Sequence, residues 1–341
     1  MVGAFFVFGL RDYCCSTLCW EKSTPTNRGS LPNNAIQEAL SKRFRRLLSG
    51  DPDGVPPWLE VIAAGDEPGL YLPTDAPWVV HADFGTLVGG IRALLMQALH
   101  PGSLTGVANH SRYEQDALGR LAGTIRWLTV TTFGSYSAIA GEALRVNRMH
   151  KRVTGEYQTS DGEQRQYKAA DPDLLLWVHI AFMDSFLRCH QMFAWREIPS
   201  GTDVGAVPGE TGADAYVRLW ADSVKPIGLV KAPMNEVELV REIERYKREL
   251  VATDKTLDVV KFIRKPPLPP LAKPTYNLLF EAAVLSLPIE FRELLGLKAK
   301  PRWFIQPLTR GVLRFIRFAI GPDSPIEDGA IDRLRRIGTL N

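Results

Sequence analysis

The chain has 341 residues, of which 45% are hydrophobic and 23% are charged, a globular composition that excludes a disordered, collagenous or largely membrane-embedded protein. Its formal net charge is only +3, and Lys and Arg are interleaved with Asp and Glu, so no basic block indicates nucleic-acid binding. Three of the 4 cysteines crowd the N-terminus and Cys189 stands alone, a pattern that excludes a disulfide framework and favours a reducing cytoplasm.

The first 34 residues show neither helical nor strand periodicity. Their apolar start lacks a basic region before it and falls short of the roughly 20 residues that a membrane span needs. We therefore expect residues 1–34 to be a poorly ordered leader, or the product of a misassigned start codon. Residues 35–341 are expected to form a single large helical domain without a transmembrane span, although length alone also allows two domains.

The pattern from residue 35 onward is mainly helical. Asn34 can cap a helix over residues 35–48, whereas residues 51–80 carry many Pro, Gly and Asp residues and predict a loop. An apolar helix is expected over residues 87–99, ending before Pro101 and Gly102.

Two long helical patterns follow at residues 116–132 and 135–153, with Gly134 as the break between them. The polar turn around Gly162 then predicts a small β-hairpin between residues 155 and 167. Asp171-Pro172-Asp173 is a strong helix start, because proline fits the first turn and acids face the positive end of the helix dipole. That helix should run to about residue 195.

The C-terminal part is expected to contain helices at residues 212–223 and 234–252, then an extended proline-rich strap at residues 265–274. Residues 309–320 form an amphipathic helix that carries Arg310, Arg314 and Arg317 on one face. Such a helix either lies on anionic lipid or docks on the domain with its arginines in solvent.

The sequence lacks the nucleotide-binding, serine-hydrolase, zinc-protease and di-iron signatures. It contains instead six histidines on or beside apolar helices, and histidine is a usual ligand of haem iron: His81, His100, His110, His150, His179 and His190. Local sequence leaves two interpretations of His150 and His179 open, because a buried structural imidazole and a metal ligand give the same pattern.

Arg120 and Thr124 lie four residues apart, so they project from one helical face and can bind an anion or an oxygenated ligand together. A solvated arginine beside a threonine bonded to its own helix is the alternative. Gly123 lies between them, and a glycine inside a helix costs about 1 kcal/mol of stability relative to alanine. A flat group packed closely against the helix would explain why glycine stands here.

Taken in order, Arg120-x-x-x-Thr124, His150-x-x-Val153-x-Gly155, Tyr167-x-Ala169-x-Asp171-Pro172 and Trp177-Val178-His179 resemble one known catalytic domain. This is the domain shared by latex-clearing protein (rubber oxygenase) and the mycophenolic-acid-pathway oxygenase of the MpaB type, over residues of about 75–300. The resemblance implies a mainly helical fold around a haem b pocket. It further implies that His150 is the iron ligand and that Arg120 and Thr124 are catalytic residues that line the pocket. His179, in the last of these motifs, is a further candidate cofactor-binding residue.

The chain departs from this family at Gly123, where latex-clearing enzymes can carry a lysine as second axial ligand. The glutamate base of rubber cleavage also has no clear counterpart, with Glu114 in uncertain register.

The main hypothesis is a cytoplasmic haem b oxidoreductase, an O2-dependent oxygenase acting on a hydrophobic, isoprenoid-like molecule. The alternative is a non-catalytic haem- or lipid-binding protein of the same fold, with weak contact to a membrane surface.

Overall fold

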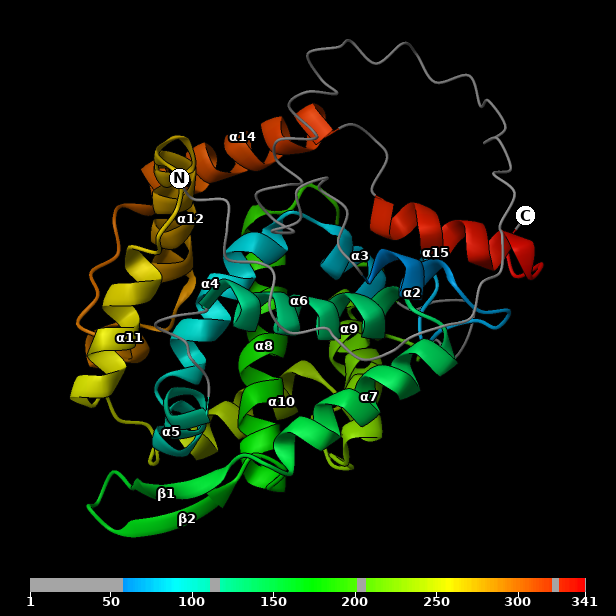
Figure 1. Ribbon diagram of the computed structural model, residues 1–341. Helices are drawn as coiled ribbons and strands as arrows, with labels where there is room; N and C mark the ends of the chain where they lie inside the picture. Colours follow the sequence, from blue (N-terminus) through cyan, green and yellow to red (C-terminus); the bar gives the residue numbers. More distant parts are fainter. Residues whose placement is uncertain (1–57, 111–116, 201–206, 321–324, 341) are drawn as a thin grey trace.

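The computed structural model describes residues 58–110, 117–200, 207–320 and 325–340. Over these residues the fold is mainly helical, with a two-stranded antiparallel hairpin projecting from one end of the helical body (Figure 1). This confirms the predicted fold class of a mainly α protein with a small β-hairpin. The predicted leader and the helix at residues 35–48 lie outside the described residues, so the division of the chain at residue 34 stays a prediction.

The described residues form helices and two β-strands. In order they are α2 (Leu59–Ala63), α3 (Ala76–Ala82), α4 (Gly85–Gln97), α5 (Pro101–His110), α6 (Ala117–Phe133), α7 (Tyr136–His150), β1 (Thr154–Gln158), β2 (Gln164–Lys168), α8 (Pro172–Phe193), α9 (Gly212–Trp220), the 3-10 helix η1 (Ala221–Ile227), α10 (Glu236–Tyr246), α11 (Asp254–Arg264), the 3-10 helix η2 (Pro270–Ala272), α12 (Lys273–Ser286), α13 (Ile289–Leu294), α14 (Arg302–Ile320) and α15 (Pro325–Arg336).

The core is organised around α4 and α8, which pack against each other more extensively than any other pair of helices described. α8 starts at Pro172, as the sequence predicts, and most of its side chains are buried around its whole circumference. Gly89 permits the close approach, because a Cβ at this position would lie 2.7 Å from Cδ1 of Phe186. α12 lies against α4, and α3, α9, α10 and α14 pack around α8 (Figure 1).

A buried ion pair joins the two central helices. The guanidinium of Arg92 donates from Nη2 to Asp184 Oδ2 at 2.6 Å, from Nη1 to Ser185 Oγ at 2.8 Å, and from Nε to the Ser286 carbonyl at 3.2 Å. Because each of the three nitrogens of this buried cation meets an acceptor, the pair fixes the register of α4 on α8.

Two sequence predictions were wrong, and proline contributes to both. The expected loop at residues 51–80 contains α2 and α3, and Pro77 lies in the first turn of α3. The apolar helix ends before Pro101 as predicted, since α4 ends at Gln97, but Pro101 also begins α5, which the sequence did not indicate. Pro274 lies in the first turn of α12, so the expected extended strap ends earlier than residue 274. Proline is compatible with a first helical turn because that turn needs no N–H donor.

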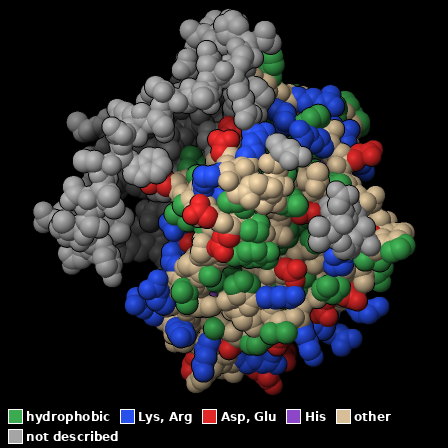
Figure 2. All heavy atoms as spheres, turned by 90° about the vertical axis from the view of Figure 1, so that its right-hand side faces the viewer, with side chains coloured by type: hydrophobic (Ala, Val, Ile, Leu, Met, Phe, Trp, Pro, Cys, Tyr) green, Lys and Arg blue, Asp and Glu red, His purple; other side chains and the backbone are tan. Residues whose placement is uncertain are grey.

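Within the described residues, no single helix meets the length and hydropathy of a membrane span, and one pair of helices, α3 with α4, meets them only together across a bend of 93°. On the face shown in Figure 2, basic and acidic side chains are interspersed among hydrophobic ones over much of the surface. This agrees with the small net charge of +3.

Candidate functional site

The predicted site residues on α6 and α7 belong to a pair of antiparallel helices that meet at Gly134. Ser135 begins α7 by accepting a hydrogen bond from the Ala138 N–H at 3.3 Å. Glu142 of α7 accepts from Arg126 Nε of α6 at 2.9 Å and from Arg145 Nε at 2.9 Å. Burial alone would raise the pKa of the Glu142 carboxyl, but the two guanidinium groups outweigh it and hold this pKa below its usual range.

The ion pair between Arg126 and Glu142 fixes how the two helices are aligned. Arg120 precedes Arg126 by six residues and His150 follows Glu142 by eight, so they lie about 9 Å and 12 Å along their helices toward the same end. In Figure 1, α6 and α7 converge at the Gly134 turn and separate toward this end. Thr124 is half-buried on α6, and His150 is half-buried as the last residue of α7. The side chain of Arg120 lies outside the described residues.

A short hydrogen-bonded stem ties the end of α7 to the start of α8. The Val153 N–H donates to the His150 carbonyl at 3.1 Å, and the Ala169 N–H donates to the Val153 carbonyl at 2.9 Å. Asp171 Oδ2 accepts from the Lys168 N–H at 2.8 Å, directly before Pro172 begins α8. We call this segment, from His150 to Pro172 across the base of the hairpin, the hairpin junction.

Tyr167 explains why glycine stands at two positions around the hairpin junction. Its ring is buried, and burial raises the pKa of its hydroxyl. A Cβ at its cross-strand partner Gly155 would lie 3.0 Å from the ring, and one at Gly106 of α5 would lie 3.2 Å from it. The residues Val153, Gly155, Tyr167 and Asp171 of the ordered motif therefore build the junction.

His179 lies seven residues into α8, about 10 Å from its start. It is buried, and burial lowers the pKa of its imidazole to about 3, so the ring is neutral at physiological pH. Its Nε2 atom is buried and has no hydrogen-bond partner among the described residues. A buried polar nitrogen without a partner costs about 1–3 kcal/mol, so this atom is placed at a cost to stability.

The 3-10 helix η1 links the regions of His150 and His179, and sequence analysis did not identify it as part of the site. Asn147 of α7 donates from Nδ2 to the Pro226 carbonyl of η1 at 3.2 Å. On its other side, Val224 and Ile227 of η1 pack with residues in the first turns of α8, Leu175 and Leu176. The Lys225-Pro226-Ile227-Gly228 sequence is a turn signal that could have indicated this element.

The other histidines with described side chains are engaged elsewhere. His81 is bonded at both ring nitrogens, to Thr132 Oγ1 at 2.8 Å and to Tyr216 Oη at 3.0 Å. His100 Nδ1 accepts from the Ser103 N–H at 3.4 Å while its Nε2 lies 3.6 Å from Glu249. His190 Nε2 donates to the Arg196 carbonyl at 2.9 Å. The side chain of His110 and all of Glu114 lie outside the described residues.

Gly123 lies on α6 one residue before Thr124, and a Cβ built on it would meet no described atom within 4 Å. Gly123 thus contrasts with Gly89, where the Phe186 ring occupies the space that a Cβ would take. The space beside this helix face fits the sequence expectation that a flat group packs there.

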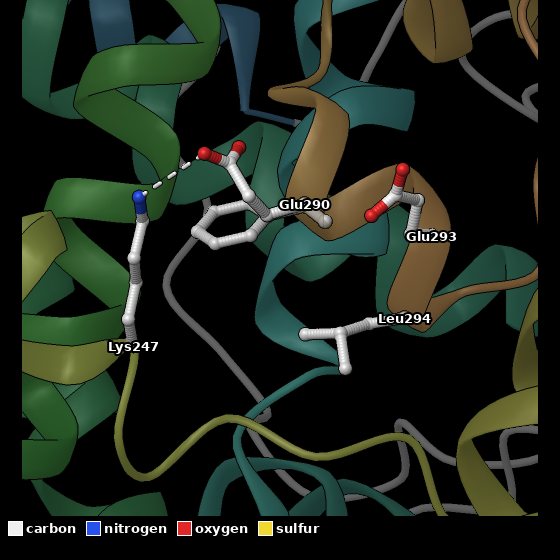
Figure 3. A pocket seen from close by; sticks show the side chains of 5 residues that line it. Lys247, Glu290, Glu293 and Leu294 are labelled. Atoms are coloured by element: carbon white, nitrogen blue, oxygen red, sulfur yellow. Dashed lines mark ion pairs between the residues drawn. The ribbon is translucent and has the colours of Figure 1, made fainter.

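A separate depression lies on the surface between the end of α10 and α13 (Figure 3). Its volume is about 480 Å³, and it is lined by Lys247, Glu290, Phe291, Glu293 and Leu294. Lys247 points to Glu290, with Nζ 3.5 Å from Oε1, whereas Glu293 extends away from this pair (Figure 3). Its open, charged lining does not suit a hydrophobic substrate, and none of the predicted site residues lines it.

Among the described side chains, no group of three or more His, Cys, Asp and Glu residues is placed to hold a metal ion. A haem iron needs only one or two protein ligands, so the donors compatible with this fold are single histidines. His179 and the space at Gly123 fit a haem group, since one supplies an unpartnered buried nitrogen and the other supplies room beside α6.

A family model described as "ER-bound oxygenase mpaB/B'/Rubber oxygenase, catalytic domain" matches residues 78–318. This match covers more than half of the chain, and the chain therefore belongs to this oxygenase family. The resemblance expected from residues of about 75–300 is confirmed. Searches of curated proteins and of solved structures gave no match.

Proposed function

We propose that this protein is a haem b-dependent oxygenase that uses O2 to attack a hydrophobic, isoprenoid-like substrate. The family match supports an oxygenase role. The cofactor assignment rests on the hairpin junction. The junction holds His150, at the end of α7, beside the start of α8, and α8 carries the neutral, buried His179.

His150 is the proposed iron ligand and His179 the proposed supporting residue. A haem b group supplies an iron centre at which O2 is activated for attack on an alkene. His179 is neutral, so its Nε2 is able to hydrogen-bond a cofactor substituent or the His150 ring without adding charge. The junction fixes the backbone of His150 through Val153, which restricts the direction of its ring.

Arg120 and Thr124 are the proposed pocket residues on α6. Arg120 carries a permanent positive charge that suits a propionate or an oxygenated substrate group. Thr124 lies one turn further along the same face and offers a hydroxyl to the same ligand. Gly123 has no side chain that could bind the iron of a haem held here, and the apolar helices α4 and α8 would enclose the hydrophobic substrate.

The first test is the visible absorption spectrum of the purified, haem-reconstituted protein, oxidised and reduced. We expect a Soret band in the wild type and in His190→Gln, because His190 is bonded to the Arg196 carbonyl, and its loss in His150→Ala. A Soret band unchanged in His150→Ala would refute this ligand, and no Soret band at all would refute the cofactor.

The second test measures O2 consumption and alkene cleavage with isoprenoid substrates. We expect turnover by the wild type and a loss of at least tenfold in Thr124→Val and Arg120→Ala. Haem binding without O2 consumption for any isoprenoid would favour the non-catalytic alternative.

A further inference from the structure

The outward face of α14 carries exposed hydrophobic side chains toward both ends of the helix. Its large hydrophobic side chains remain exposed by fractions from 44% to 79%: Trp303 79%, Phe304 49%, Leu308 44%, Phe315 62% and Phe318 73%. At 100° per residue, these positions occupy a sector of about 140° of the helix circumference. We call these five residues the α14 apolar face.

The inward face of α14 is firmly held, so the apolar face has a fixed orientation. Ile305, Leu313 and Ile316 belong to the hydrophobic core. Arg310 Nε and Gln306 Nε2 both donate to the Met192 carbonyl at the end of α8, at 2.9 Å and 3.0 Å. The chain therefore presents the aromatic side chains outward while its inward side is bonded to α8.

This arrangement differs from the one expected for a docked helix with solvated arginines. Arg310 is turned toward α8, and the guanidinium of Arg317 lies over the Trp195 ring at 4.5 Å from its centroid. Two of the three arginines are thus used to orient the helix. Arg314 remains exposed beside the aromatic residues.

The charged residues in and around α14 are all basic. Residues 294–322 contain no Asp or Glu. They contain six basic residues, namely Lys298, Lys300, Arg302, Arg310, Arg314 and Arg317. Lys300 is paired with Glu281 at 3.4 Å, and Arg302 donates from Nε to Gln306 Oε1 at 2.9 Å on the opposite side of the helix. Arg314 is exposed about 20° from Trp303, at the edge of the apolar face. An apolar, aromatic surface with a basic edge complements the acyl chains and the anionic headgroups of a lipid bilayer.

A second copy of the chain fits this face less well. The helix is about 28 Å long and about 10 Å wide, so two such faces would bury about 600 Å² in total. Stable interfaces between proteins bury about 1,200–2,000 Å². A membrane surface needs no minimum interface area of this kind, because it is fluid and accommodates a helix of any length at the depth that its side chains reach.

We propose that α14 docks the protein on the surface of an anionic lipid bilayer, with Trp303, Phe315 and Phe318 inserted and Arg314 against the headgroups. The helix lies parallel to the membrane and does not cross it. This docking does not depend on haem or on turnover, and it would bring the protein to the phase in which isoprenoid-like molecules dissolve.

The test is co-sedimentation of the full-length protein with vesicles of phosphatidylcholine alone and of phosphatidylcholine with phosphatidylglycerol. We expect binding to the anionic vesicles that weakens with added salt. The double variant Phe315→Ser/Phe318→Ser should bind about tenfold more weakly, equivalent to about 1.4 kcal/mol. The matched control Val230→Ser/Val237→Ser removes two side chains exposed by 81% and 68% elsewhere and should bind like the wild type.

A charge-reversed pair gives a second, independent comparison. Arg314→Glu should weaken binding to anionic vesicles without changing binding to neutral ones, whereas Arg241→Glu, at an exposed position on α10, should change neither. Equal binding of the phenylalanine variant and the wild type overturns the proposal. A wild-type dimer that this variant converts to a monomer also overturns it. So does a loss of thermal stability in this variant without a change in vesicle binding, because that result would mean that the chain itself covers the apolar face.

Discussion

The interface between α4 and α8 and the set of predicted site residues use the same kinds of residue in opposite ways. Around α4 and α8, the buried Arg92 is bonded to Asp184 and Ser185, and Gly89 is filled by the Phe186 ring. Among the predicted site residues, the buried His179 has an Nε2 without a partner among the described residues, and a Cβ on Gly123 of α6 would meet no described atom within 4 Å.

We interpret this difference as one between residues that stabilise the fold and residues that are available to bind a ligand. Native proteins pair almost all of their buried polar groups, so a buried nitrogen without a partner needs an explanation. Strain or missing partners concentrate at binding sites, where a ligand supplies what the protein lacks. If this interpretation is right, substitutions in the two regions should shift stability in opposite directions.

The largest expected effect is at Arg92. Arg92→Ala leaves Asp184 buried with a single remaining partner, Arg188, whose Nε lies 3.1 Å away, and removes the bonds to Ser185 and Ser286. We expect the free energy of unfolding to fall by about 3–5 kcal/mol in urea titrations. The exposed Arg241→Ala should change it by less than about 0.5 kcal/mol. A loss below about 1 kcal/mol at Arg92 would mean that this pair does not hold the two helices together.

The pH dependence of stability is the next largest effect. Burial lowers the pKa of both His81 and His179 from 6.5 to about 3. The unfolded chain therefore binds more protons below pH 6.5, and the stability contributed by the neutral histidines is lost as pH falls toward 3. Between pH 6.5 and pH 5.0 the two histidines should lower the free energy of unfolding by about 3 kcal/mol.

His81→Gln separates the two histidines in this experiment. The variant removes one titrating group. Between pH 6.5 and pH 5.0 its free energy of unfolding should therefore fall by about 1.6 kcal/mol less than that of the wild type. An identical pH dependence in the variant and the wild type would show that folding does not lower the pKa of His81.

The sequence predicts some elements well because their signals are local. The start of α8 follows from Asp171 and Pro172, and the hairpin follows from the turn at Gly162, whose φ of 90° favours glycine. α3, α5 and α12 were missed or misplaced because a proline in a first turn looks in sequence like a proline that ends a helix. The two outcomes differ only in what the following residues pack against.

The candidate site was predictable in its residues but not in its geometry. Family resemblance supplied His150, Thr124 and Arg120, and helical spacing placed the last two on one face. The neutral state of His179 depends on its burial in the folded chain, which no local pattern encodes. The roles of all four residues stay proposals.

A comparison of two buried histidines tests the difference between the regions directly. The Thr132 hydroxyl donates to the Leu128 carbonyl at 2.7 Å, so it accepts from His81 Nδ1, and His81 Nε2 accepts from Tyr216. His81→Leu should therefore cost about 2–3 kcal/mol, because the Tyr216 hydroxyl loses its partner. His179→Leu removes a nitrogen that has no described partner, so stability without haem should stay equal or rise by about 1 kcal/mol.

The informative result for His179→Leu is the combination of two measurements. Urea unfolding without haem should show no loss, while reconstitution should show weaker haem binding. A loss of 2 kcal/mol or more in the haem-free variant, comparable with the effect expected at His81, would assign His179 to the scaffold instead.

The smallest expected effects come from the two helix glycines, and their signs should differ. At Gly89 a methyl group would lie 2.7 Å from Cδ1 and 3.3 Å from Cα of Phe186, so Gly89→Ala should cost about 1–3 kcal/mol of overpacking, only partly offset by helix propensity. At Gly123 a methyl group meets nothing within 4 Å of the described atoms, so Gly123→Ala should stabilise the haem-free protein by about 0.5–1 kcal/mol. Urea unfolding measures both. If a flat cofactor packs against this face of α6, the same alanine that stabilises the empty protein must weaken haem binding. An alanine that raises stability and leaves haem affinity unchanged would place the cofactor elsewhere, and the open space at Gly123 would then be ordinary solvent.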